Sequence, residues 1–142
     1  MIIKILKIIY YWFPPIIYMG IIFYLSSRHS ASISPNHTIN FIFYKTGHMI
    51  EFAILYFLIF RAFYSASSIK GNNKLIIPLI ISILYAVSDE IHQTFTPTRE
   101  GRLRDIFIDT GGIIIMYIYI RIKFKQYLNS NKLKDPISII IN

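Results

Sequence analysis

The segment SDEIHQTFTPTREGRLRD, residues 88–105, is a charge-dense passage between two of the most apolar stretches of the chain. Isoleucine, leucine, tyrosine and valine precede it, and isoleucine, methionine and tyrosine follow it. The segment itself carries acids, arginines and a histidine. Any fold of this chain has to place these ionisable groups among apolar helices.

The composition predicts an all-α integral membrane protein. The chain has 142 residues, of which 54% are hydrophobic and only 15% are charged, against about a quarter charged in soluble domains. It contains no cysteine, which excludes disulfides, thiolate metal sites and a cysteine nucleophile. The net charge of +8 comes from basic residues that flank apolar runs, so no nucleic-acid partner is expected.

Apolar windows predict a bundle of about four transmembrane helices, at residues 8–25, 43–63, 74–93 and 105–123. The transmembrane domain is expected over residues 1–125, with a basic C-terminal tail over 126–142. The first window has a basic start like a signal peptide, but its apolar run is longer than a typical signal core, which favours a membrane span.

The uninterrupted apolar runs of the last three windows are too short for a bilayer. They are FAILYFLIF, LIIPLIISILYAVS and TGGIIIMYIYI, against about 20 residues for a full span. Each helix must therefore draw polar residues into the membrane or its interface. These residues begin the second helix, end the third and begin the fourth, so they are expected on one side, around a shared polar pocket.

The distribution of lysine and arginine predicts which side that is. The loops on the opposite side carry most of the basic residues and few acids, which is typical of the cytoplasmic side. Both termini are then cytoplasmic and the pocket opens outward. The arginines of residues 99–104 count against this assignment.

Lys45, His48 and Glu51 are spaced three apart, so on a helix they share one face. They are either part of a site or a polar stripe that pairs with neighbouring helices. Asp89, His92 and Gln93 also share a face, and a carboxylate three residues before a histidine can fix the tautomer of that histidine. Glu90 lies about 100° round the helix from Asp89.

The role of the loop arginines, Arg99, Arg102 and Arg104, allows two interpretations. The arginines recognise a phosphate or carboxylate through the guanidinium fork, or they neutralise the buried acids. Asp105 and Asp109 are four residues apart and continue towards Gly112, where close helix packing is the commoner role of glycine. The neighbouring cations argue against a metal site, and no cofactor is expected.

The segments KTGHMIEFAILYFLIFRAF and LYAVSDEIHQTFTPTREGRLRDIFIDTGG resemble the VanZ-like family of small bacterial membrane proteins, whose namesake is associated with resistance to the lipoglycopeptide teicoplanin. The resemblance covers residues 44–112. Thr98 departs from it, because glycine is frequent at this position in the family. The residues that match the family's motifs are Lys45, His48, Glu51, Asp89, Glu90, Gln93, Pro97, Arg99, Asp105, Asp109 and Gly112.

The resemblance implies an envelope membrane protein that contributes to glycopeptide resistance, for which we expect binding or modification of an outward-facing lipid or lipid-linked cell-wall precursor. The expected ligand-binding residues are Lys45, Gln93, Arg99, Arg104, Asp105 and Asp109. The alternative is an intramembrane hydrolase or transferase acting on a lipid-linked substrate. Its candidate catalytic residues are His48, Glu51, Asp89, Glu90 and His92. A carrier is a third class, for which four helices without repeats are few.

Overall fold

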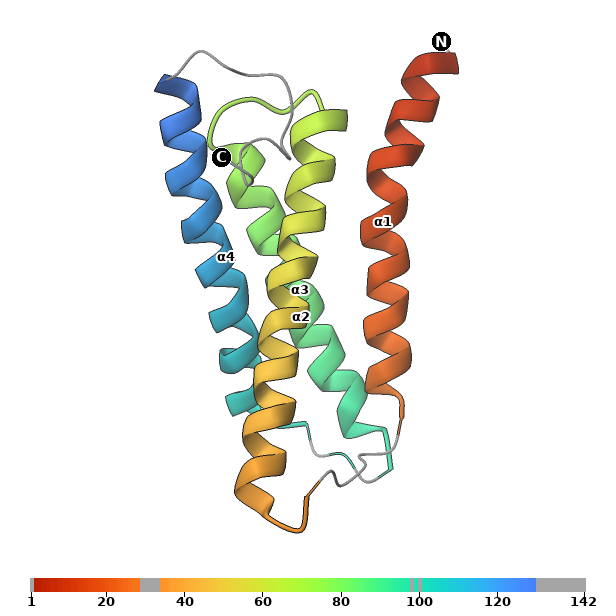
Figure 1. The fold of residues 1–142 in the computed structure, drawn as a ribbon. Coiled ribbons are helices and arrows are strands. Elements are labelled where there is room, and N and C mark those ends of the chain that lie inside the picture. Colours follow the sequence, from red (N-terminus) through yellow and green to blue (C-terminus); the bar gives the residue numbers. More distant parts are fainter. Residues whose placement is uncertain (1, 29–33, 98, 100, 130–142) are drawn as a thin grey trace.

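A computed structural model describes residues 2–28, 34–97, 99 and 101–129. This part of the chain folds into four α-helices without a strand: α1 (Ile2–Ser26), α2 (His37–Ala66), α3 (Asn73–Thr94) and α4 (Leu103–Asn129). The predicted all-α bundle is confirmed. Successive helices run in opposite directions, so α1 and α3 end at the same end of the bundle where α2 and α4 begin (Figure 1). We call this end the polar end.

Helix α2 is the centre of the bundle. It packs against each of the other three helices, most extensively against α4, whereas α1 and α4 make no direct contact within the described residues. The core is built largely by large side chains of α2, with contributions from the other helices. The fully buried members of α2 include Phe52, Leu55, Tyr56, Ile59 and Phe60.

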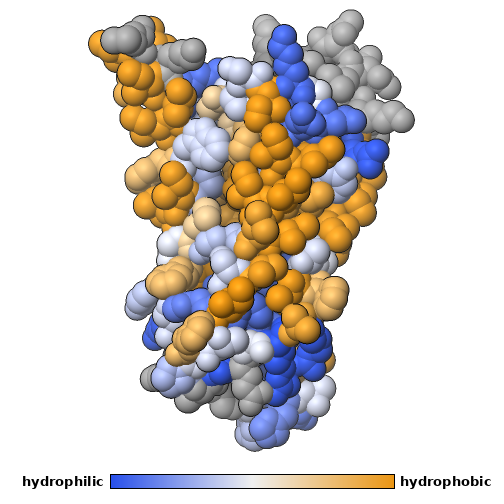
Figure 2. All heavy atoms as spheres, turned by 180° about the vertical axis from the view of Figure 1, so that it is seen from behind, coloured by the Kyte–Doolittle hydropathy of each residue, from blue (hydrophilic) through white to orange (hydrophobic). Residues whose placement is uncertain are grey.

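The outer surface is apolar in the middle and polar towards the ends. Figure 2 shows apolar side chains gathered across the middle of one face and hydrophilic ones towards both ends, the polar end and the opposite one. Isoleucines and phenylalanines that would be buried in a soluble protein are exposed on every helix, from Ile3 on α1 to Ile122 on α4. This is the surface expected of a protein whose solvent is lipid.

Within the described part of the chain, three helices are long and apolar enough to cross a membrane: Ile5–Ser26, His37–Ala66 and Asn73–Thr94. Helix α4 has a shorter apolar stretch, residues 110–120, between acids at its start and basic residues at its end. Asp105 and Asp109 are 5% and 1% exposed, so these acids face other parts of the protein. Helix α4 packs along α2 (Figure 1).

The second helix begins six residues earlier than the sequence windows suggested, at His37. Its N-cap is Asn36, whose side-chain oxygen accepts a hydrogen bond of 2.9 Å from the Thr38 amide. An asparagine after a proline is a helix-start signal that a search for apolar runs does not detect. Lys45 and His48 consequently lie two to three turns inside α2.

The two prolines of the first span, Pro14 and Pro15, are accommodated inside α1, which continues through both. The turn between α2 and α3 contains Gly71 at φ 63°, a left-handed conformation that favours glycine. Of the predicted tail, residues 126–129 belong to α4, and residues 130–142 lie outside the described residues, as does Thr98.

Candidate functional site

Polar side chains are buried together at the polar end of the bundle. The end of α3, the start of α4 and the loop between them supply most of them: Asp89, Glu90, Gln93, Thr96, Asp105 and Asp109, none more than 7% exposed. Helix α2 adds Lys45, His48 and Glu51. The short apolar runs of the sequence are the reason, because polar residues had to enter the bundle to complete each helix.

A short ion pair joins the second helix to the fourth. The Lys45 ammonium lies 2.6 Å from an Asp105 carboxylate oxygen, and these side chains are 21% and 8% exposed. Arg104 is a weaker partner of Asp105, at 3.5 Å and 54% exposed, and its guanidinium lies over the Phe41 ring. Arg104 therefore lies at the rim, outside the cavity described below.

His48 connects two of the carboxylates. Its Nδ1 atom is 3.9 Å from an oxygen of Glu51 and 3.9 Å from an oxygen of Asp109, distances that are too long for hydrogen bonds. Asp89 and Arg99 lie close enough to Glu51 to act on its charge. The geometry therefore brings the predicted residues of α2, α3 and α4 into one electrostatic cluster.

Three buried carboxylates, those of Asp89, Asp105 and Asp109, keep an oxygen without a hydrogen-bond partner among the described residues, although Oδ1 of Asp105 lies 3.5 Å from Arg104. Asp89 accepts a 2.9 Å hydrogen bond from Gln93 through Oδ2, but its Oδ1 atom has no partner, and neither does Oδ2 of Asp109. Unsatisfied buried oxygens are costly.

Glu90 holds the loop that carries Arg99. Its Oε1 atom accepts a 2.6 Å hydrogen bond from the backbone amide of Arg102. The loop passes so close to the end of α3 that a Cβ atom on Gly101 would lie 2.3 Å from the Thr94 methyl and 2.6 Å from the Glu90 carbonyl oxygen. Glu90 therefore acts on the site through the position of the loop.

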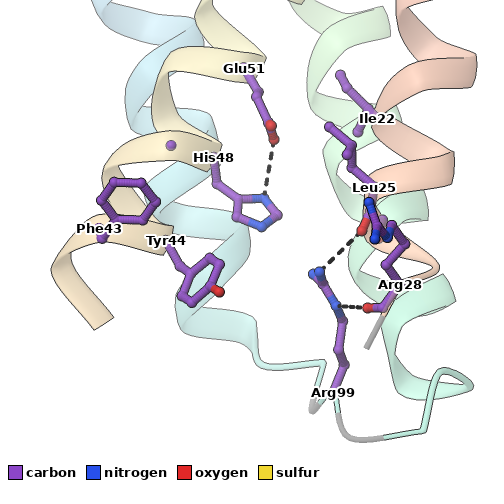
Figure 3. Close-up of a pocket in the computed structure, with 10 residues that line it drawn as sticks. Ile22, Leu25, Arg28, Phe43, Tyr44, His48, Glu51 and Arg99 are labelled. Atoms are coloured by element: carbon purple, nitrogen blue, oxygen red, sulfur yellow. Dashed lines mark hydrogen bonds and ion pairs between the residues drawn. The ribbon is translucent and has the colours of Figure 1, made fainter. Parts of the chain in front are cut away.

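Arg99 is fixed against the end of α1. Its Nε atom donates a 2.9 Å hydrogen bond to the Arg28 carbonyl, and its Nη2 atom donates one of 3.1 Å to the Leu25 carbonyl (Figure 3). The last carbonyls of a helix lack intrahelical donors and carry partial negative charge. The two bonds use two of the five N–H groups of the guanidinium.

A cavity of about 370 Å³ lies between α1 and α2, next to this arginine. Figure 3 shows Ile22 and Leu25 of α1 on one side, Phe43, Tyr44, His48 and Glu51 of α2 on the other, and both arginines at its end. The buried Ser26 hydroxyl also lines it, and no described residue forms a hydrogen bond with it. The residues that line the cavity are Ile22, Leu25, Ser26, Arg28, Phe43, Tyr44, Gly47, His48, Glu51 and Arg99.

His92 does not join this site. Its Nε2 atom is 3.0 Å from the Ser27 hydroxyl oxygen, and its ring lies 4.4 Å from that of Phe23. The expectation that Asp89 orients His92 is wrong, since Asp89 is paired with Gln93. The Ser27 hydroxyl donates a 2.7 Å hydrogen bond to the Phe23 carbonyl, and the direction of its contact with His92 depends on the tautomer of the imidazole.

Sequence reasoning missed the contribution of the first helix. Ser26 and Arg28 follow directly after the first apolar span, at the end of the bundle where the charged loop lies. That position was the available signal, because alternation of the spans already placed both segments on one side. The cavity between α1 and α2 depends on how these helices pack, and a sequence pattern does not predict that packing.

Among the described residues, no three histidine, aspartate or glutamate side chains are placed to hold a metal ion together. The Lys45 ammonium instead occupies the position beside Asp105.

The fold and the site define a class of protein: a small, helical, multi-pass membrane protein with a buried polar site at one end. The family model VanZ/LLP1 matches residues 10–124, which is most of the chain. The chain belongs to the VanZ/LLP1 family, and the match extends the resemblance at residues 44–112 to all four helices. Neither a curated protein nor a solved structure matches the chain.

Proposed function

We propose that this protein contributes to glycopeptide tolerance of the bacterial envelope by binding the phosphate or carboxylate of an outward-facing lipid or lipid-linked cell-wall precursor. The observation that carries the proposal is the cavity beside Arg99. A guanidinium bound to the carbonyls of Leu25, in the last turn of α1, and of Arg28, just after it, lies at one end of this cavity.

The chemistry of the lining favours an anionic group with further polar substituents. Arginine binds phosphate and carboxylate through charge-assisted hydrogen bonds. The Ser26 hydroxyl and the half-buried Glu51 carboxylate are placed to bind hydroxyl or amide groups of the same ligand. Binding sites of this kind combine apolar walls with a few polar groups, as here with Ile22 and Leu25.

The link to resistance rests on family membership and on the expected orientation. The resemblance to the VanZ-like family implies a role in teicoplanin resistance, and the lysine and arginine distribution favours an outward-facing polar end. A site there would meet lipid-linked precursors at the surface where a lipid-bearing glycopeptide acts.

The experiment is an incubation of purified protein with a labelled lipid-linked cell-wall precursor, read by mass spectrometry. Saturable retention of unchanged precursor is the expected result. Arg99→Lys keeps the charge but loses the planar fork, and we expect it to weaken retention about tenfold, or about 1.4 kcal/mol. Arg104→Lys is the matched control, because Arg104 lies outside the cavity. Equal retention by the two variants contradicts the proposal.

One observation favours a catalytic alternative. His48 lies between Glu51 and Asp109 and borders the cavity, an arrangement in which a histidine can act as a general base with carboxylate partners. On this alternative the protein is an intramembrane hydrolase or transferase. A new product in the same mass spectra, lost in His48→Ala, would establish it in place of the binder.

A further inference from the structure

A second, apolar groove lies directly beside the polar cavity. It has a volume of about 560 Å³ and runs along one face of α2, where six residues line it: Ile39, Ile42, Phe43, Thr46, Gly47 and Ile50. Their spacing of three and four residues keeps them on a single face of the helix. Both the polar cavity and this groove fall in the size range of ligand sites in proteins.

The two spaces share a wall. Phe43 and Gly47 line both the groove and the polar cavity. At Gly47 a Cβ atom would meet no other atom within 4 Å, so helix packing does not explain a glycine here. A side chain at this position would instead extend into open space beside the two sites.

From this continuity we infer that the ligand is an amphiphile with a phosphate head and a hydrocarbon chain, the head beside Arg99 and the chain in the groove on α2. This inference rests on the proposed function and deepens it, because it names the class of molecule that the site takes. A free phosphate or a soluble precursor would leave the groove unused.

A hydrocarbon chain fits the groove better than a second helix does. Close helix packing in membranes uses small residues four positions apart, and the neighbours of Gly47 at that spacing are Phe43 and Glu51. The exposed isoleucines Ile39, Ile42 and Ile50 offer a flexible chain the apolar contacts that it needs. The arginines supply the complementary charge for its head.

The experiment uses oleoyl lysophosphatidate as the probe, which has one phosphate and one chain, and native mass spectrometry of the detergent-purified protein. Thr46→Phe fills the groove without changing the polar cavity, since Thr46 lines only the groove. Ile54→Phe is the matched control, because Ile54 is exposed on α2 and lines neither space. Glycerol phosphate, as a competitor, represents the head without the chain.

We expect Thr46→Phe to weaken lysophosphatidate binding at least about tenfold, which corresponds to about 1.4 kcal/mol, or the burial of roughly two methylene groups. Ile54→Phe should bind like the wild type. The affinity for glycerol phosphate itself, obtained from the competition after allowing for the lysophosphatidate affinity of each variant, should be equal in wild type and Thr46→Phe and lower in Arg99→Gln.

The outcomes separate the two proposals. If Arg99→Gln changes neither ligand, the proposed function fails. If Arg99→Gln weakens both ligands while Thr46→Phe and Ile54→Phe behave alike, the head site stands and the chain inference is overturned. A wild-type dimer that Thr46→Phe converts to a monomer overturns it as well, because a second copy then occupies the groove.

Discussion

The buried ion pair between Lys45 and Asp105 is the shortest contact between charged side chains described at the polar end. Removing one member of such a pair leaves an uncompensated charge, which costs roughly 3–5 kcal/mol. We expect Lys45→Met and Asp105→Asn each to lower thermal stability in detergent strongly. The double variant should be more stable than either single one, and a strictly additive loss would contradict a direct pair. Arg104→Gln, at an exposed partner of Asp105, should cost only about 0–1 kcal/mol.

Glu90 is predicted to act through the loop and not through its charge. Glu90→Gln keeps an acceptor oxygen for the Arg102 amide, whereas Glu90→Ala removes it. Precursor retention should therefore survive in Glu90→Gln and fall in Glu90→Ala, with thermal stability measured beside it. Restoration by glutamine is the readout, and a glutamine variant as defective as the alanine variant would show that the charge itself is needed.

At the scale of single residues, the sequence predicted which side chains lie near one another but not which of their atoms form contacts. Asp89 and Gln93 are four residues apart on one helix, and this spacing places their side chains within hydrogen-bonding distance. His92 lies on the same face by count, yet its partners are Phe23 of α1 and Ser27, the residue after α1. Contacts within a helix follow from its period, whereas contacts between helices depend on packing geometry that one sequence does not reveal.

Helices α2 and α4 approach each other closely at Gly112. A Cβ atom there would lie 2.0 Å from the Met49 carbonyl oxygen, while one at the neighbouring Gly111 would meet nothing within 4 Å. Gly112→Ala should therefore push the helices apart and cost about 1–3 kcal/mol. Gly111→Ala is the matched control and should be close to the wild type. Melting temperatures that fall equally for both variants would argue against close packing at Gly112.

The existence and order of the helices were predictable because apolar runs alternate with polar segments along the chain, although the runs of the last three windows are short. The start of α2 was not, since Asn36 begins the helix before its apolar run. The cavity and the groove were also not predictable. They are spaces between and beside helices, and Phe43, Tyr44 and Gly47 read in the sequence as ordinary membrane residues.

The distribution of lysine and arginine predicts which end of the bundle faces the cytoplasm. Reporter fusions at Ser67, between α2 and α3, and at Thr96, between α3 and α4, test it. We expect a cytoplasmic signal at Ser67 and an external one at Thr96. The opposite pattern would turn the polar end inward and remove the proposed access to envelope precursors.

Glu51→Gln, expressed in a glycopeptide-sensitive bacterium, tests most directly whether the polar end binds a ligand or only stabilises the bundle. Membrane abundance and teicoplanin tolerance are measured together. The Glu51 side chain is 30% exposed and 3.9 Å from His48, so the isosteric change should cost little stability. We predict wild-type abundance with loss of teicoplanin tolerance, and a smaller effect of the wild-type protein on vancomycin than on teicoplanin. Tolerance that falls only in proportion to membrane abundance would contradict a binding site at the polar end.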